Sequence, residues 1–484
     1  MNVLLITLDQ FRGDCLSLAD HPVVRTPNLD RLASLGTWLP RHYSQAAPCS
    51  PGRACLYTGT YQFNNRVVGN GTPLDDRFDN VARAGLRAGY RPTLFGYADQ
   101  GIDPRAASGP DDPRLSTYEG VPPGFDVGLE LLEDQEAWLR WLEGLGYRVE
   151  GAVKALRSEP ERPAEHGVSA FLTDRLLEWL RRQDDPWFLH ASYLRPHPPY
   201  FAAGRWARAY DPDEVPDPVP APDRPQPFSG HLSEQRAPDD QAELRSLRAQ
   251  YYGMISDVDE QLGRLWDGLA ELGVWDDTFV VVTSDHGEQL GDQGTLGKGG
   301  FFEPSYHVVG IVRDPRHPEA HGRAIDAFTE NVDILPTLCE AMGVSVPAQC
   351  DGMPLTPFLA GDEPPWWRDA AHWEYDWRWE RILFGPHEWP WDRRLERQNL
   401  AVLRSDSVGY VQFGNGEWRC FDLASDPTWR TEIDDPAVVL RSAQSMLAWR
   451  ASHADRLLTD MLLIDGGVGR VPASPAASAG PLTG

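Results

Sequence analysis

The 484-residue sequence lacks any apolar run near the ~18 residues that a membrane-spanning helix needs. The apolar segment Asn2 to Thr7 meets Asp9 and Arg12 with no basic segment before it, which is not the pattern of a secretory signal. The six cysteines are scattered and form neither a Cys-x-x-Cys pair nor a zinc-type cluster. These absences predict a cytoplasmic protein with reduced thiols and no membrane partner.

Basic residues are also scarce. The sequence has 45 Lys and Arg and 72 Asp and Glu, which gives a formal net charge of −27. This imbalance argues against nucleic acid as a partner, since a polyanion is repelled by a surface of its own sign. The acidity itself favours solubility. A small anionic substrate remains compatible with it, because the charge inside a cleft can oppose the overall sign.

Two uninterrupted apolar runs predict strands of a parallel sheet that is buried on both faces. Val3 to Leu8 is followed by Asp9, and Thr278 to Ser284 is followed by Asp285 and His286. Ligands of open α/β sheets bind at the carboxyl ends of strands, so these three side chains are candidate ligands of one shared cation. For Asp9 alone, capping the next turn is an equally good interpretation.

The segment Cys49 to Arg53 fits the pattern Cys-x-Pro-x-Arg. Pro51 is expected to stop a helix from running back through the cysteine, so that the first turn spans Ala54 to Thr58. Cys49 then lies at a helix N-terminus, where an anion is favoured, and Arg53 adds a fixed positive charge. The pattern indicates a nucleophile at an anion site. Taken in isolation, it more often marks a buried cysteine beside a structural arginine.

Three further polar residues lie in loops. Asn70 follows a turn-rich stretch, and His197 is held between two prolines after a strand at 187–193, which suits a positioned acid or base. An exposed loop histidine is the competing interpretation. Lys298 lies in the glycine-rich segment 294–300, which lacks the spacing of a nucleotide-binding P-loop.

The remaining pattern predicts an α/β fold with a large mixed, mostly parallel sheet flanked by helices, and a smaller C-terminal α+β domain. The first domain spans 1–365 and the second 366–484, which begins with a Trp-rich stretch. Antiparallel strands are expected within 400–421, and a tail from Gly466 is expected to be mobile or used in assembly. Helices are expected at 79–88, 131–145, 170–182, 241–272 with a break near Gly253, 331–342 and 438–457.

Taken together, these motifs resemble the sulfatase family of the alkaline phosphatase superfamily, most closely the bacterial phosphonate monoester hydrolases and the related dimeric arylsulfatases. The resemblance runs nearly end to end. The segments that carry it are Asn2–Ile6 with Asp9-Gln10, Thr26–Leu32, Cys49–Gly59, Arg195–Pro199, Thr283–Asp292 and Trp449–Arg456.

The resemblance implies that a maturase oxidises Cys49 to formylglycine, whose hydrate is the nucleophile. It implies that Asp9, Asp285 and His286 hold one divalent metal ion together with an oxygen of the modified Cys49. A mostly oxygen ligand set favours Mn²⁺ or Ca²⁺. The remaining roles it implies are orientation of the formylglycine by Arg53 and contacts with substrate oxygens or the leaving group by Asn70, His197 and Lys298.

Two departures bear on the substrate, because many sulfatases have Asp where this chain has Gln10 and Asn where it has His286. The Gln and His pair is similar to the phosphonate hydrolases. With the implied metal, the site carries a net charge of about +1, which favours monoanions. We therefore predict sulfate monoester hydrolysis with promiscuous phosphonate monoester and phosphodiester hydrolysis.

The first alternative is phosphonate monoester or phosphodiester hydrolysis as the main activity. Two others are a metal-dependent phosphatase or phosphomutase that uses unmodified Cys49, and a catalytically silent binding protein on the same fold. The expected partners are a small anionic ester and the maturase, and the resemblance implies a homodimer or homotetramer.

Overall fold

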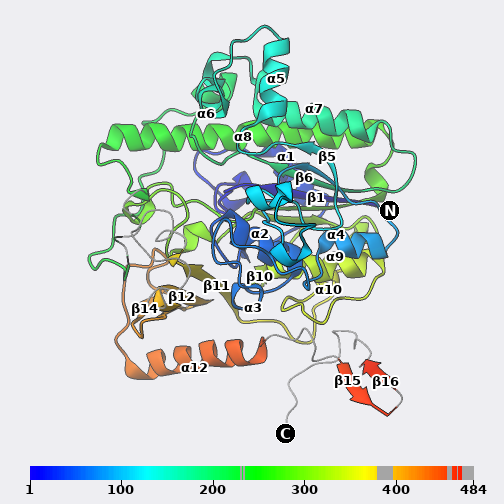
Figure 1. The fold of residues 1–484 in the computed structure, drawn as a ribbon. Helices are drawn as coiled ribbons and strands as arrows, with labels where there is room; N and C mark the ends of the chain where they lie inside the picture. The colour runs from blue at the N-terminus through cyan, green and yellow to red at the C-terminus, as the bar shows by residue number, and fades with distance from the viewer. Residues whose placement is uncertain are drawn as a thin grey trace.

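The computed structural model describes residues 1–228, 230, 232, 235–378, 396–454, 461–465 and 467–470. Its centre is an eight-stranded sheet in the order β5-β4-β6-β1-β7-β8-β2-β9 (Figure 1). The five strands from β5 to β7 are parallel, and β8 reverses the direction. The bounds are β1 Asn2–Leu8, β2 Thr37–Trp38, β4 Thr93–Gly96, β5 Asp126–Glu130, β6 Phe188–Tyr193, β7 Thr278–Thr283, β8 Gly310–Arg313 and β9 Arg323–Ala324.

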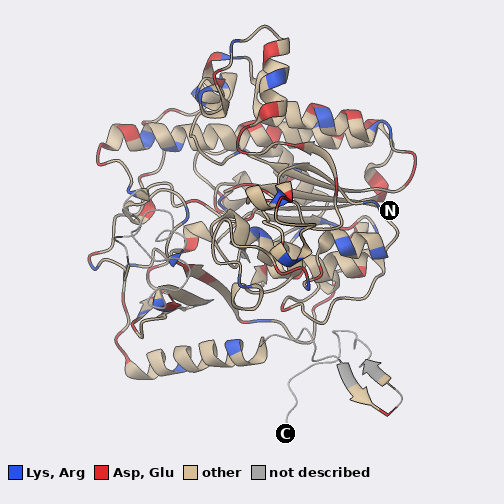
Figure 2. Ribbon diagram, viewed as in Figure 1, with Lys and Arg blue, Asp and Glu red and all other residues tan. Residues whose placement is uncertain are grey.

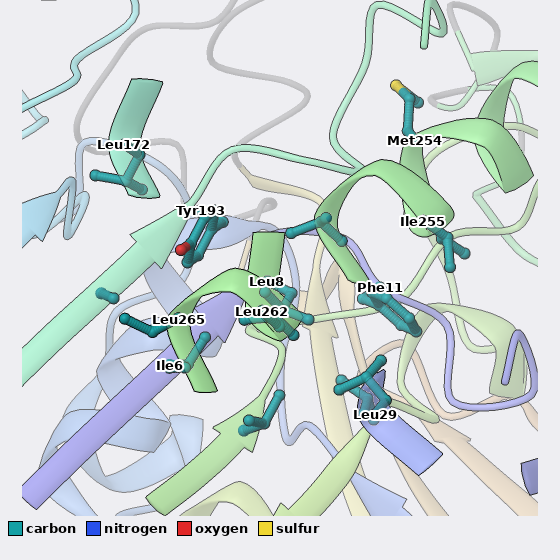
Figure 3. Packing of buried hydrophobic residues seen from close by; sticks show 14 of the residues in the cluster. Ile6, Leu8, Phe11, Leu29, Leu172, Tyr193, Met254, Ile255, Leu262 and Leu265 are labelled. Atoms are coloured by element: carbon teal, nitrogen blue, oxygen red, sulfur yellow. The ribbon is translucent and has the colours of Figure 1, made fainter. Parts of the chain in front are cut away.

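Strand β1 is apolar on both sides because helices cover both faces of the sheet. Leu4, Ile6 and Leu8 pack on one side against α1 (Pro27–Ser34), α7 (Val168–Leu180) and α8 (Gln241–Glu271), as Figure 3 shows for part of this cluster. Val3 and Leu5 pack on the other side against α2 (Cys49–Thr58), α4 (Val81–Arg87) and α9 (Ile334–Met342). The alternation of side chains along a strand thus builds a three-layer sandwich.

The outer helices carry charges of both signs. Figure 2 shows acidic and basic residues interspersed along α8 and other outer helices. None of the helices in the described part of the chain is both long and apolar enough to cross a bilayer. The remaining bounds are α3 Gln62–Asn65, α5 Glu136–Gly144, α6 Ala152–Arg157, α10 Thr356–Leu359 and the paired short strands β3 His42–Tyr43 and β10 Thr329–Glu330.

A second sheet of four antiparallel strands follows in the order β11-β12-β13-β14. One face packs against α12 (Pro436–Ser452) through residues such as Met446 and Trp449, and the other packs on the first part of the chain through Trp373 and Tyr306. The bounds are β11 Ala370–Asp376, β12 Asn399–Ser405, β13 Val408–Phe413 and β14 Trp418–Asp422, and a separate pair is formed by β15 Met461–Ile464 and β16 Gly467–Arg470.

The predicted fold class is confirmed, whereas the domain boundary at 365 and 366 stays a prediction. The expected break in α8 is wrong: a Cβ at Gly253 would lie 2.4 Å from the carbonyl oxygen of Trp206, so the glycine permits a close approach of backbone, not a kink. The helix expected from Leu131 begins only at Glu136, after Gln135 in a left-handed conformation. The Trp-rich residues 379–391, the helix beyond 454, and Gly466 with 471–484 of the tail lie outside the described residues.

Candidate active site

The acids that follow β1 and β7 lie side by side because of the register of the two strands. Thr7 pairs with Thr283, so Asp9 and Asp285 occupy matching positions just beyond the strand ends. The backbone N–H of Gln10 donates to Asp285 Oδ1 at 3.2 Å, which extends the contact past the sheet. The structure therefore brings both carboxylates to one edge, as the sequence predicts.

Helix α2 begins at Cys49, and Arg53 follows one turn later on the same face. The expectation that Pro51 delays this helix is wrong, since Pro51 is its third residue. Proline is tolerated in a first turn, where backbone N–H groups have no acceptor within the helix. Cys49 is thus the first helical residue, and only 5% of it is exposed.

Asp9, Cys49, Asp285 and His286 form a buried cluster in which one ligand atom of each lies within 4.8 Å of the others. The Nε2 atom of His286 is 3.3 Å from Cys49 Sγ and 3.9 Å from Asp9 Oδ1. Its Nδ1 donates to the carbonyl oxygen of Gly287 at 3.0 Å, which leaves the Nε2 lone pair facing the cluster. Asp9 Oδ1 is buried with no hydrogen-bond partner among the described residues. Two carboxylates, one of them with an unsatisfied oxygen, and an imidazole fit a divalent cation.

Arg53 lies behind the cluster and holds its acids in place. Its side chain is fully buried and donates to Asp285 Oδ2 at 2.9 Å and to Asp9 Oδ2 at 3.1 Å. It also donates to Ser192 Oγ at 2.8 Å and to the Tyr97 carbonyl oxygen at 2.9 Å. The Tyr97 hydroxyl donates to Asp9 Oδ2. The Oδ2 atoms are thus engaged, and the Oδ1 atom of Asp9 is directed to the cluster.

Lys298 reaches the cluster from the glycine-rich loop. Its Nζ lies 3.4 Å from Cys49 Sγ and donates to Gln10 Oε1 at 2.8 Å. The amide of Gln10 in turn donates to buried Glu288, which also accepts from the backbone N–H of Gly297 at 2.6 Å. The carboxylate of Glu288 therefore binds both Gln10, which accepts from Lys298, and Gly297, which precedes Lys298 in the chain. The sequence pattern contains Glu288 just after His286 but does not reveal this contact.

Burial and local charge set the protonation states. Burial, with the nearby charge of Asp9, raises the pKa of the Cys49 thiol well above its ordinary value despite the opposing effect of Lys298, so an unmodified Cys49 stays protonated at neutral pH. Burial and then Lys298 lower the pKa of both His286 and His197, so both imidazoles are neutral. Burial opposes the charge of Lys298, but Cys49 and then Asp9 and Asp285 raise the pKa of the ammonium group.

A cleft of about 420 Å³ opens over Cys49, with Asn70, His197 and Lys298 in its walls. Asn70 accepts a hydrogen bond from the Ser50 N–H at 3.0 Å, and so also caps the first turn of α2. The Nδ1 of His197 donates to the Pro198 carbonyl oxygen at 2.8 Å. All eight residues singled out from the sequence thus lie in or directly behind one cavity.

The sequence reasoning missed three other residues of this region. Tyr97 and Asp99 line the cleft after β4, and Gln100 donates to the Ser50 carbonyl oxygen at 2.8 Å. None belongs to a motif that a single sequence reveals. Their position at the carboxyl end of a parallel strand is the signal that could have found them.

Comparison with known proteins agrees with this geometry. Residues 1–344 match the family model described as "Sulfatase", and residues 291–439 match "N-sulphoglucosamine sulphohydrolase, C-terminal". The chain is similar to the phosphonate monoester hydrolase of Agrobacterium radiobacter, with a TM-score of 0.87 and 40% identity over 97% of this chain and 99% of that one.

Two curated relatives extend the comparison. The multifunctional alkaline phosphatase superfamily protein PehA of Trinickia caryophylli is 35% identical over 95% of this chain and 96% of its own length. An arylsulfatase of Clostridium perfringens is 26% identical over 89% and 90%. The match extends over nearly the whole length of each protein and includes both sheets. The chain therefore belongs to the sulfatase family of the alkaline phosphatase superfamily.

Proposed function

We propose that this chain is a formylglycine- and metal-dependent hydrolase of monoanionic esters, namely sulfate monoesters and phosphonate monoesters, with phosphodiesters as further substrates. The observation that carries the proposal is the buried cluster of Asp9, Cys49, Asp285 and His286 beneath a cleft that Lys298 enters. Membership of the sulfatase family supports a metal ion and a modified cysteine at this place.

The metal ion, Mn²⁺ or Ca²⁺, would be held by Asp9, Asp285 and His286, and would polarise an anionic oxygen of the substrate. Formylglycine at position 49 would supply, as its hydrate, one hydroxyl for attack and a second whose deprotonation expels the bound group. Arg53 holds the two carboxylates in place through its ion pairs with them. Lys298 offsets the negative charge that spreads over the substrate oxygens.

The tautomer of His197 bears on which residue protonates the leaving group. Because its Nδ1–H donates to the Pro198 carbonyl oxygen and the ring is neutral, Nε2 carries no proton to give. This supports Lys298 as the general acid and His197 as an acceptor for a substrate or water proton. The test is the Lys298→Ala variant with aryl esters of graded leaving-group basicity: loss of rate should grow with basicity, and a uniform loss contradicts the acid role.

The ranking of the two ester classes rests on different observations. The prediction from the sequence as a whole places sulfate monoesters first. Gln10, His286 and the likeness to the Agrobacterium phosphonate monoester hydrolase favour the reverse order, with phosphonate monoesters first. Measuring kcat/KM for 4-nitrophenyl sulfate, 4-nitrophenyl phenylphosphonate and 4-nitrophenyl phosphate on one metal-analysed preparation decides between them. If the largely dianionic phosphate is best, the preference for monoanions is wrong.

Modification of Cys49 is tested directly by the mass of its tryptic peptide, which should lie about 18 Da below the cysteine form. A peptide wholly in the thiol form from an active preparation would support the phosphatase or phosphomutase alternative instead. Absence of turnover in protein with formylglycine and metal would support the binding-protein alternative. The homodimer or homotetramer stays a prediction, which light scattering at micromolar concentration checks.

A further inference from the structure

The cleft has an acidic wall that the proposed chemistry leaves unused. Asp99, Glu119 and Glu133 line it together with leucines such as Leu131. Among the described residues that line the cleft, Lys298 is the one Lys or Arg, and it lies against Cys49. The rest of the cavity therefore presents negative charge to the organic part of an ester whose anionic group is held at the cluster.

Asp99 is the most unusual of these acids. Only 6% of it is exposed, yet its carboxylate makes no hydrogen bond and no ion pair to any residue in the described part of the chain. Its backbone has a left-handed φ of 50°, a conformation that few non-glycine residues adopt and that carries a cost. Burial raises the pKa of Asp99 to about 7, against the opposing charge of Arg53. A buried carboxylate without a donor is costly, and a hydrogen-bonding cation from outside would relieve that cost.

The two other acids are held beside it by contacts between separate loops. Glu119 accepts a hydrogen bond from the backbone N–H of Glu133, and the Tyr118 hydroxyl donates to the Glu133 carboxylate. These contacts join the loops at 118–119 and 133 into one wall of the cleft. Like-charged groups kept close in this way lower the potential over the cavity and attract a cation.

We propose that the substrate is a zwitterionic ester whose organic part carries an ammonium group, and that Asp99 binds this group inside the cleft. The inference rests on the proposed function, because the cluster must hold the anionic end of the ester. The ammonium group donates hydrogen bonds to the unpaired carboxylate of Asp99, Glu119 and Glu133 add long-range attraction, and Leu131 contacts the hydrocarbon between the two charges. The same wall repels an organic group that carries a second negative charge.

A matched pair of substrates tests the proposal. The sulfate and phenylphosphonate esters of 4-(2-aminoethyl)phenol and 4-propylphenol have the same size and similar leaving groups, and differ in a terminal ammonium against a methyl group. In the wild-type protein, kcat/KM should favour the ammonium ester by about tenfold or more. The Asp99→Asn variant should lose about tenfold of this preference, mainly through KM. Comparing the ratio in the variant with the ratio in the wild type cancels any difference in intrinsic reactivity between the two esters.

The control is Glu143→Gln, which removes one charge from an exposed position of α5 outside the cleft and should keep the wild-type ratio. If the neutral ester equals or exceeds the ammonium ester in the wild type, or if Asp99→Asn keeps the full ratio, the cation site is refuted. If Asp99→Asn fails to fold, two other results test the cation site. They are the kcat/KM ratio of the ammonium ester to the neutral ester in the wild type, and a decrease of that ratio in Glu119→Gln.

Binding of the two free phenols separates this proposal from the proposed function. Titration calorimetry on metal-loaded protein should show that 4-(2-aminoethyl)phenol binds more tightly than 4-propylphenol, and that Asp99→Asn removes the difference. If this holds while neither ester is hydrolysed, the cation site stands and the proposed function fails. If both esters are hydrolysed equally and the phenols bind equally, the hydrolase stands and the cation site fails.

Discussion

Replacing Arg53 by methionine tests how the structure holds two buried acids together. The substitution keeps an unbranched apolar side chain but removes the donors to Asp9, Asp285 and Ser192. Among the described residues, it also removes the only positive charge that contacts both carboxylates. Removing one partner from a buried ion pair costs about 3–5 kcal/mol, because the remaining charge is left uncompensated. The Arg53→Met protein should therefore be substantially less stable.

The size of the chain determines how this cost is observed. With an unfolding entropy of about 2 cal/mol/K per residue, a chain of 484 residues has a total near 1 kcal/mol/K, so the loss corresponds to a decrease of roughly 3–5 °C in the unfolding midpoint. A divalent metal ion at the cluster would offset part of the uncompensated charge. The decrease should consequently be larger in chelator than with saturating Mn²⁺ or Ca²⁺.

Scanning calorimetry of the wild type and Arg53→Met, each with chelator and with metal, measures both effects. Arg91→Met is the matched control, because Arg91 forms an ion pair with Asp126 at 2.7 Å but is 87% exposed. Such a surface pair contributes about 0–1 kcal/mol, so the control midpoint should change by about 1 °C or less. The reasoning is refuted if Arg53→Met unfolds together with the wild type in chelator, or if metal leaves the difference between them unchanged.

Three further substitutions probe other parts of the structure. Asp285→Ala should lose both metal, measured by elemental analysis, and turnover; a variant that keeps both contradicts the proposed ligand set. Glu288→Gln should keep its metal but lower kcat by about 10- to 100-fold with little change in KM, because Gln10 and Lys298 lose their anchor, and an equal change in KM would indicate a merely structural role. Burial and then the charge of Glu159 raise the pKa of Asp257 from 3.8 to about 8. Its contribution to stability is therefore full below about pH 4 and is lost as pH rises through about 8, so Asp257→Asn should flatten the decline of the unfolding midpoint between pH 5 and 8. An unchanged slope would show that Asp257 does not titrate as its burial requires.

The parts of the site that could be predicted are those whose signal is local. An apolar run that ends in Asp9 and another that ends in Asp285 indicate strand ends of a parallel sheet, whatever their partners are. The pattern from Cys49 to Arg53 indicates a nucleophile at a helix N-terminus beside a positive charge. The local sequence alone is enough to indicate these features, and the structure brings the residues together at the predicted edge of the sheet.

The parts that could not be predicted depend on contacts between distant segments. Nothing in the neighbourhood of Gly253 shows that the Trp206 backbone passes close to it, so a structural glycine resembles a helix break. Asp99 and Glu288 are ordinary acids in sequence, and their burial becomes evident only when loops far apart in the chain close over them. Pro51 was misjudged because the first turn of a helix and the residue before it have similar sequence signals.

The central place of β1 has a consequence for the synthesis of the protein. This strand is made well before its two neighbours in the sheet, which begin only at Phe188 and Thr278. At about 5–20 residues per second, translation leaves β1 without its second partner for roughly 15–55 s. Cys49 emerges early in that interval, and in the folded protein its buried thiol contacts His286, which directly follows the end of β7. If Cys49 is modified as proposed, a maturase that needs an accessible thiol would act before this region folds, so slower translation should raise the modified fraction.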